Sequence, residues 1–129
     1  MKKAVNALII KNKRLLLFRK NLTWTLPGGK PEKGESDIET LVREFKEEAS
    51  GAEIKLGRYY RTFLERATLI QEPLEAALYF AKIKSPNLKL TPSGEIKEIR
   101  FVGYFGSFFI YLSNITRKII KQLFEERYL

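Results

Sequence analysis

Three glutamates within one predicted helix have the spacing of a binding site for a divalent cation. At 100° per residue, Glu44, Glu47 and Glu48 point to one side of the helix. Three like charges so close together are unfavourable on a bare helix. A hard cation such as Mg²⁺ or Mn²⁺ prefers oxygen ligands and would relieve the repulsion. Because Glu-x-x-Glu-Glu alone is more often a solvated helix face, the neighbouring residues must decide.

A flexible turn precedes this helix. Gly28 and Gly29 follow Pro27, and glycine lets the backbone turn tightly and expose its carbonyl and amide groups. Glu35 and Arg43 add another carboxylate and a guanidinium group between the turn and the glutamates. Flexible backbone followed by clustered carboxylates is what a metal-dependent phosphate site requires.

The absence of histidine and cysteine restricts the chemistry. It excludes imidazole bases, Ser-His and Cys-His nucleophiles, disulfides and thiolate metal ligands. Acid–base chemistry would therefore use carboxylates, lysine, tyrosine or bound water. The 129 residues suit a single domain, 1–129. Only a short apolar run follows the basic start, so we expect no signal peptide, no membrane span and a cytoplasmic location.

The net charge of +9 indicates an anionic partner. A nucleotide, a polyphosphate or a nucleic acid would qualify. Lysines spread over the surface for solubility would give the same charge, so the charge alone does not choose among these partners.

The hydrophobic pattern predicts strands and two helices that position these residues. The predicted strands are Ala4 to Ile10, Arg14 to Phe18, Glu53 to Leu64, Leu74 to Lys84 and Lys97 to Val102. The first two should form a hairpin, and the predicted helices are Ser36 to Ala49 and Asn114 to Tyr128. Ser36 to Glu39 fits a capping box. The expected buried stripe of the first helix is Ile38, Leu41, Val42, Phe45 and Ala49. The element order favours a mixed sheet covered on both faces.

The spacing of the glycine, glutamates and arginine matches a longer pattern. Gly29 is followed by five residues and Glu35, then by seven residues and the run Arg43-Glu44-Phe45-Lys46-Glu47-Glu48. This is the Nudix signature, and the chain therefore resembles a Nudix (MutT-like) hydrolase. The resemblance implies an α+β fold of α/β/α sandwich type, with a mixed curved sheet between helices. It also implies a pyrophosphohydrolase that uses Mg²⁺ or Mn²⁺.

The resemblance also implies roles for individual residues. The implied metal ligands are the carbonyl of Gly29 and the side chains of Glu35, Glu44, Glu47, Glu48 and Glu95. The implied catalytic residues are Arg43, Glu44, Glu47 and Glu95, and the implied substrate-binding residues are Arg19, Lys20, Trp24, Gly28 and Gly29. Arg43 is expected to hold a catalytic glutamate, first of all Glu44, because a bidentate guanidinium suits that role better than lysine.

Several of these assignments have plainer alternatives. Glu95 is chosen over Glu98 by its distance from the aromatic residue in the following strand, and Glu98 would instead pair with Arg100 or Lys97. Glu35 could simply complement a helix N-terminus. Arg19 and Lys20 could be a solvated strand end. Aromatic residues such as Trp24 are more often core than base-stacking platforms.

The mechanism implied is attack of a water on a diphosphate, with metal ions polarising phosphorus and lowering the pKa of that water. Glu44 and Glu95 are rival general bases. The expected substrate is a (d)NTP or an oxidised (d)NTP, cleaved to a nucleoside monophosphate and pyrophosphate. Diadenosine polyphosphates, ADP-ribose and RNA 5′ ends are alternatives, as is a nucleotide- or RNA-binding domain without activity. The expected partner is therefore a small diphosphate compound, with RNA as the second choice. The chain is expected to be a monomer or a homodimer.

Two segments depart from what the family usually has. The helix-ending glycine comes one residue late, as Gly51, so either the helix boundary shifts or Ser50 is strained. The stretch Phe101 to Tyr111 is unusually aromatic. We expect its side chains to pack in the protein first and to form an interface second.

Overall fold

The computed structural model describes residues 1–129 and contains the predicted elements in the predicted order. The strands are β1 (Lys2–Leu8), β2 (Ile10–Lys11), β3 (Arg14–Lys20), β4 (Thr23–Thr25), β5 (Gly28–Gly29), β6 (Ile54–Glu65), β7 (Leu74–Ile83) and β8 (Ile96–Val102). The helices are α1 (Asp37–Glu48), a 3₁₀ turn η1 (Gly106–Phe109) and α2 (Asn114–Glu125). The chain contains no helix long and apolar enough to cross a membrane.

Two four-stranded sheets form the body of the molecule. One has the order β5-β1-β7-β6, in which only the central pair β1 and β7 is parallel. In the other, β3 pairs with β2, β4 and β8, all antiparallel. The predicted hairpin is present only at its turn, where the short β2 pairs with β3, because β1 pairs with β5 and β7 in the other sheet. The turn residues Asn12 and Lys13 have positive φ of 52° and 59°. That backbone twist matches two antiparallel strands.

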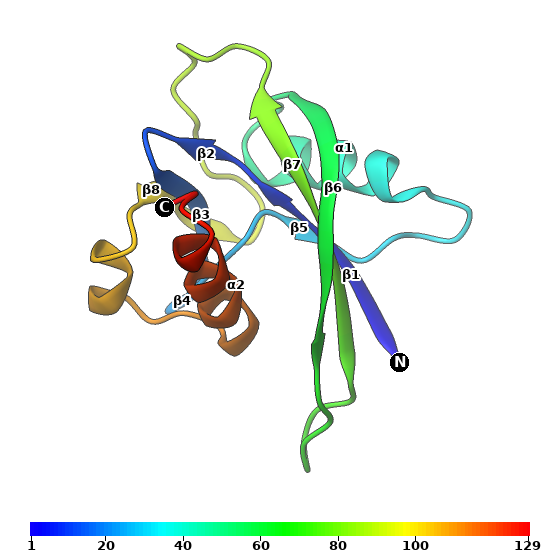
Figure 1. Cartoon of the computed structure of the whole chain (residues 1–129). Helices are drawn as coiled ribbons and strands as arrows, with labels where there is room; N and C mark the ends of the chain where they lie inside the picture. Colours follow the sequence, from blue (N-terminus) through cyan, green and yellow to red (C-terminus); the bar gives the residue numbers. More distant parts are fainter.

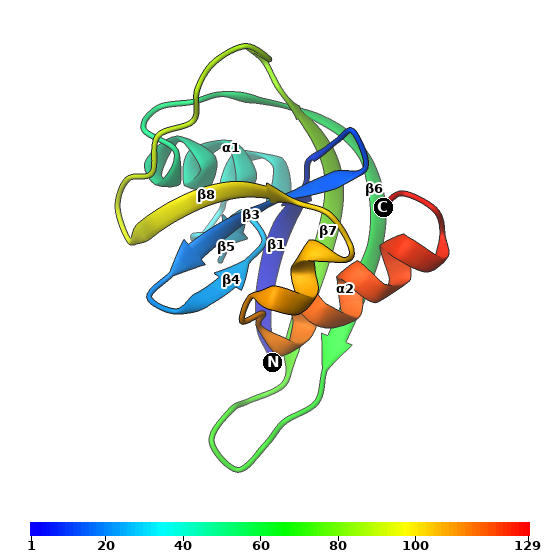
Figure 2. The same cartoon turned by 90° about the vertical axis from the view of Figure 1, so that its left-hand side faces the viewer.

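The two helices lie on opposite sides of the strands, as predicted (Figure 1). In Figure 2, β8 lies beside β3. The helix α1 lies behind these two strands, on the side away from α2. One core cluster contains Leu41, Phe45 and Ala49 of α1, whereas the other contains Ile119, Ile120 and Leu123 of α2. Each helix therefore buries one apolar stripe against its own face of the strands.

Local signals explain the ends of α1. Ser36 is the N-cap and accepts a hydrogen bond from the Glu39 amide, while the Glu39 side chain accepts one from the Ser36 amide. This is the predicted capping box. The predicted buried stripe holds for Leu41, Phe45 and Ala49, whereas Val42 is only half-buried and Ile38 is 52% exposed. Ile38 lies in the first turn of α1 and is not part of the core cluster that contains Leu41 and Phe45.

The aromatic stretch 101–111 is more exposed than expected. Phe105, Phe108, Phe109 and Tyr111 are between 65% and 88% exposed. Several rings nevertheless contact one another, with Tyr104 stacked on Phe124 of α2 at 3.6 Å between centroids. The expectation that this segment packs inside the protein holds for its first two residues, which lie on β8, and is wrong for most of the side chains beyond them.

Candidate active site

The glycine pair is held against α1 by strand pairing. β5 pairs with β1, placing Gly29 opposite Val5 and Gly28 opposite Asn6. A Cβ on Gly29 would lie 2.6 Å from Cδ of Glu44, and one on Gly28 would lie 2.1 Å from the Val5 carbonyl oxygen. Gly28 therefore requires glycine because its neighbour is backbone, whereas a Cβ on Gly29 would displace the Glu44 carboxylate, which lies directly against the Gly29 backbone.

Glu48 is the buried carboxylate of the site. The residue is 7% exposed, and its Oε1 accepts a hydrogen bond of 3.4 Å from the Gly28 amide. Burial raises the pKa of Glu48 to about 7 against the opposing effects of Lys20 and the Gly28 amide, and the charges of Glu44 and Glu47 raise it further. A buried, partly compensated carboxylate beside two others is an arrangement found more often at functional sites than on ordinary surfaces.

Arg43 lies at the centre of the acidic side chains. Its Nε and Nη2 donate to the two carboxylate oxygens of Glu35 at 2.7 and 2.9 Å. Its Nη1 lies 3.0 Å from Glu44 and 3.5 Å from Glu47. The expected contact with Glu44 is present, but the bidentate partner is Glu35. Because Glu35 also accepts from the Glu32 amide and the Thr40 hydroxyl, its oxygens are already engaged.

Lys20 connects the helix to the loop that carries Glu95. Its Nζ lies 3.8 Å from Glu48 and 3.6 Å from Glu95. Glu95 is otherwise open to solvent, with an 84% exposed side chain. Glu98 pairs instead with Arg19 and Arg100. The structure thus brings Glu95 to the site, and Glu98 has the alternative role that its neighbours suggested.

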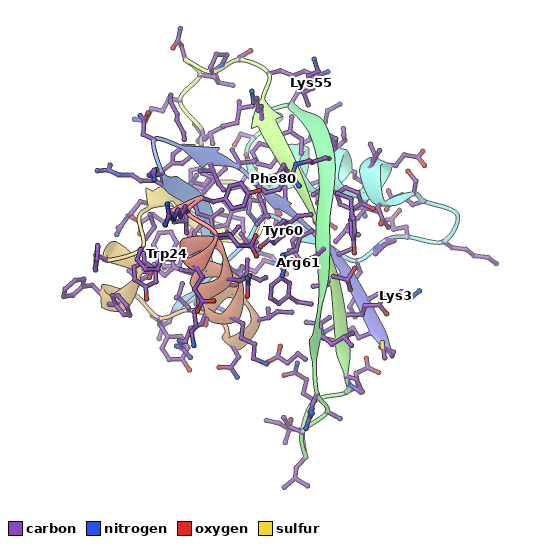
Figure 3. The ribbon with its side chains drawn as sticks, viewed as in Figure 1. Lys3, Trp24, Lys55, Tyr60, Arg61 and Phe80 are labelled. Carbon is purple, nitrogen blue, oxygen red and sulfur yellow. The ribbon has the colours of Figure 1, made fainter.

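Two predicted substrate-binding residues lie elsewhere. Arg19 donates to Glu98 and to the Asn21 carbonyl, so its guanidinium is engaged away from the carboxylates of α1. Trp24 is 5% exposed and belongs to the core cluster under α2, with the Arg100 guanidinium 5.0 Å from the centre of its ring. Figure 3 shows Trp24 among other side chains near α2. Its expected role as an open stacking surface is therefore wrong.

The donors present suit a hard divalent cation, although they do not yet converge. No three acidic side chains lie together with the spacing of metal ligands. All nearby donors are oxygens, the atoms that Mg²⁺ and Mn²⁺ prefer. Glu47 is 58% exposed on its side chain and has room to turn toward its neighbours. Burial is the main cause of the raised pKa of Glu48, and a cation here would offset both that burial and the added repulsion from Glu44 and Glu47.

A large pocket lies away from these residues. It has a volume of about 850 Å³ and is lined by residues 9–11, by the start of β6 and the end of β7, by β8 and by residues 84–90. It contains none of the predicted site residues. The chemistry of the carboxylates, rather than the size of a cavity, therefore locates the candidate site.

Sequence reasoning missed two residues that support α1 and its carboxylates. Thr40 is fully buried, and its hydroxyl donates to Glu35. Ser93, in the loop between β7 and β8, contacts the C-terminal end of α1. Thr40 stands five residues after Glu35, a separation short enough for a search for local hydrogen bonds to detect. The two hydrogen bonds of the Ser93 hydroxyl join residues that are 43 and 46 positions apart in the sequence, so no local pattern predicts them.

The comparisons with known proteins agree with this geometry. The sequence model described as NUDIX domain matches residues 1–105. A comparison with curated protein sequences gave no match. Among solved structures, the MutT protein from Methanosarcina mazei Go1 is 23% identical, with 97% of this chain and 94% of that chain covered and a TM-score of 0.79. An ADP-ribose pyrophosphatase from Streptococcus suis 89-1591 is 20% identical, with 98% and 92% covered and a TM-score of 0.74.

A third structure shares the fold but is a longer chain. A UDP-X diphosphatase is 22% identical with a TM-score of 0.75, and the match covers 97% of this chain and 63% of that one. At these identities the structural likeness shows a common fold. The sequence match, which spans most of the chain, shows more: the protein belongs to the Nudix family of pyrophosphohydrolases.

Proposed function

We propose that the chain hydrolyses a (d)NTP or an oxidised (d)NTP to a nucleoside monophosphate and pyrophosphate, with Mg²⁺ or Mn²⁺ as cofactor. The observation that carries this proposal is the buried Glu48 carboxylate between the Gly28 amide and Lys20, with Glu44 lying against Gly29. Carboxylates, a tight glycine turn and a lysine in one place are suited to a metal-bound phosphate chain.

The metal would be held by carboxylates of α1 and by the glycine turn. Glu44, Glu47 and Glu48 would bind it, together with the Gly29 carbonyl. When bound, it would polarise phosphorus and lower the pKa of a coordinated water. Glu35, whose oxygens are taken up by Arg43, Thr40 and Glu32, would orient the Arg43 guanidinium instead of binding metal directly. Arg43 in turn would fix the position of Glu44.

Glu95 is the better placed of the two candidate bases. Glu44 lies against Gly29 and accepts a hydrogen bond from Arg43, so its carboxylate is already engaged. Glu95 contacts only Lys20 and is free to approach an attacking water. It would accept the proton as the water oxygen bonds to phosphorus and the phosphoanhydride P–O bond breaks. Lys20 would then be left to neutralise the departing phosphate.

A hydrolysis screen with Mg²⁺ or Mn²⁺ tests the proposal. The panel should contain (d)NTPs, 8-oxo-dGTP, ADP-ribose, a UDP-linked sugar, diadenosine polyphosphates and 5′-triphosphate RNA. We expect turnover of a (d)NTP or 8-oxo-dGTP and its loss in Glu47→Gln and Glu48→Gln. Glu125→Gln, on the exposed side of α2, is the matched control and should retain activity.

Two outcomes would contradict the proposal in different ways. Full turnover in both site variants would exclude the assigned metal ligands. Nucleotide binding by calorimetry without hydrolysis of any compound in the panel would favour a domain that binds without cutting.

A further inference from the structure

Ser93 closes the C-terminal end of α1 from a distant segment. Its hydroxyl accepts a hydrogen bond of 2.8 Å from the Ser50 amide and donates one of 2.6 Å to the Glu47 carbonyl. Its own amide donates to the Glu48 carbonyl at 3.0 Å. One residue of the β7–β8 loop thus satisfies two carbonyls at the helix end, and both belong to candidate metal ligands.

The need for this contact follows from the local sequence. Ser50 has a φ of 49°, in the left-handed region where helices normally place glycine. The Gly51 amide donates to the Lys46 carbonyl, as in a Schellman ending. In that ending the Ser50 amide would donate to the Glu47 carbonyl. Here the Ser93 hydroxyl lies between the two groups and bonds to both.

The same contact fixes the loop that carries Glu95. The Ile96 amide donates to the Ser93 carbonyl, closing a turn around Gly94 and Glu95. Gly94 has a φ of 59°, and a Cβ there would lie 3.4 Å from the Glu47 carbonyl oxygen. The loop therefore approaches the C-terminal end of α1 closely. Glu95 lies only two residues after Ser93, which attaches the loop to the helix.

We propose that Ser93 is a positioning residue that holds Glu95 in register with the carboxylates of α1, an inference that rests on the proposed hydrolase function. Without its hydroxyl, the backbone contact to Glu48 remains, but the Ser50 amide and the Glu47 carbonyl lose their shared partner. The loop then moves more freely relative to α1. The reaction slows because Glu95 is less often in place, while binding of the nucleotide changes little.

Ser93→Ala, Ser93→Thr and the control Ser85→Ala test this role. Ser85 lies in the same loop, and its side chain makes no hydrogen bond. We expect Ser93→Ala to lower kcat about tenfold at nearly constant KM. A tenfold change corresponds to the net free energy of about one hydrogen bond. Ser93→Thr, which keeps the hydroxyl, should restore most of the rate. Amide exchange at Ser50 and Ile96, whose amides bond to the Ser93 hydroxyl and carbonyl, should quicken in Ser93→Ala alone.

A double variant separates positioning from general destabilisation. If Ser93 acts through Glu95, then Ser93→Ala should slow Glu95→Gln no further. An equal loss of kcat in both backgrounds would overturn the inference, and so would unchanged exchange at Ser50 and Ile96. The exchange measurement needs no substrate, so it tests the contact between Ser93 and the end of α1 even if no diphosphate in the panel is hydrolysed. Failure of the proposed function and failure of the positioning role are thereby distinguished.

Discussion

Arg43 binds Glu35 through two parallel hydrogen bonds, Nε to Oε2 at 2.7 Å and Nη2 to Oε1 at 2.9 Å. The same guanidinium reaches Glu44 through its third nitrogen. One planar cation thus links the loop before α1 to a carboxylate at the site. The pairing raises the pKa of Arg43 and lowers that of Glu35, so both groups remain charged at neutral pH.

Arg43→Lys should disrupt this link while keeping the charge. Lysine has one ammonium group and cannot bind Glu35 and Glu44 in the same planar arrangement. We expect kcat to fall about 10- to 100-fold, as is usual for partners that orient metal ligands. Steady-state kinetics on the substrate found in the screen would show it. Arg117→Lys, exposed on α2 and without an ion pair, is the control. Equal rates for wild type and Arg43→Lys would contradict the role.

Glu35 should make the protein sensitive to acid. The hydrogen bonds from Arg43, the Glu32 amide and Thr40 lower the pKa of Glu35 to about 2 from 4.5. Because the folded-state pKa is the lower one, the stabilisation is present above about pH 4.5 and is lost as pH falls toward 2. Urea unfolding at a series of pH values should show this loss in wild type and a smaller one in Glu35→Gln. If the free energy of unfolding fell equally with pH in wild type and Glu35→Gln, the predicted role of Glu35 in acid sensitivity would be refuted.

Glu48 has the opposite effect on the metal-free protein. Burial raises its pKa to about 7, so the folded state favours the protonated form. The stabilisation is complete below about pH 4.5 and disappears as pH rises through 7, a difference of roughly 3 kcal/mol. Glu48→Gln should therefore be more stable than wild type at pH 8 in EDTA. Because a metal binds the ionised form, the Mg²⁺-induced rise in wild-type Tm should grow from pH 5.5 to pH 8. If the rise in Tm caused by Mg²⁺ were the same at both pH values, the assignment of Glu48 as a metal ligand with a raised pKa would be contradicted.

Sequence patterns predicted the parts of this molecule that depend on near neighbours. Ser36 and Glu39 are three residues apart, so the capping box is visible in the sequence and present in the structure. The β2–β3 hairpin and the long strands β6 and β7 have equally local signals, namely turn residues and runs of apolar side chains. The spacing of Gly29, Glu35 and the α1 glutamates identified the family because a motif is a local pattern as well.

What sequence reasoning missed depends on pairing between distant segments. The resemblance implied a substrate-binding role for Trp24, but the contact of β4 with Leu112 buries it beneath α2, in the core position named as its alternative. Arg19 and Lys20 are adjacent in sequence, yet they have different partners. Arg19 pairs with Glu98 on the neighbouring strand β8, and Lys20 pairs with Glu48 and Glu95. Only the register of β3 against β8 decides between them.

Ser50→Gly should stabilise the protein by relieving strain at the end of α1. Ser50 adopts a φ of 49°, which costs an ordinary residue roughly 1 kcal/mol and glycine almost nothing. The greater freedom of glycine in the unfolded chain offsets part of the gain, leaving about 0.5 kcal/mol. The amide that bonds to Ser93 is retained, so kcat should not change. Chemical denaturation measures the gain, and a loss of stability would show that the serine side chain has a role that the strain does not outweigh.

Alanine substitutions at the two glycines of the turn should have different consequences. On Gly29, a Cβ would meet the end of the Glu44 side chain, which can move aside. Gly29→Ala should therefore change stability by less than about 1 kcal/mol, but displacing Glu44 by about 1 Å should lower kcat about 100-fold. On Gly28, a Cβ would meet the Val5 carbonyl, and φ is 146°. Gly28→Ala should thus destabilise the fold by about 2–4 kcal/mol.

Gly103→Ala is the control for both, because a Cβ there would meet only Arg14, at 3.8 Å. It should leave both Tm and kcat near the wild-type values. Thermal unfolding and initial rates measured on all three variants separate the two glycines. If Gly29→Ala kept full activity, the close contact between Gly29 and Glu44 would have no part in catalysis, and the metal-binding role proposed for Glu44 would lose its structural support.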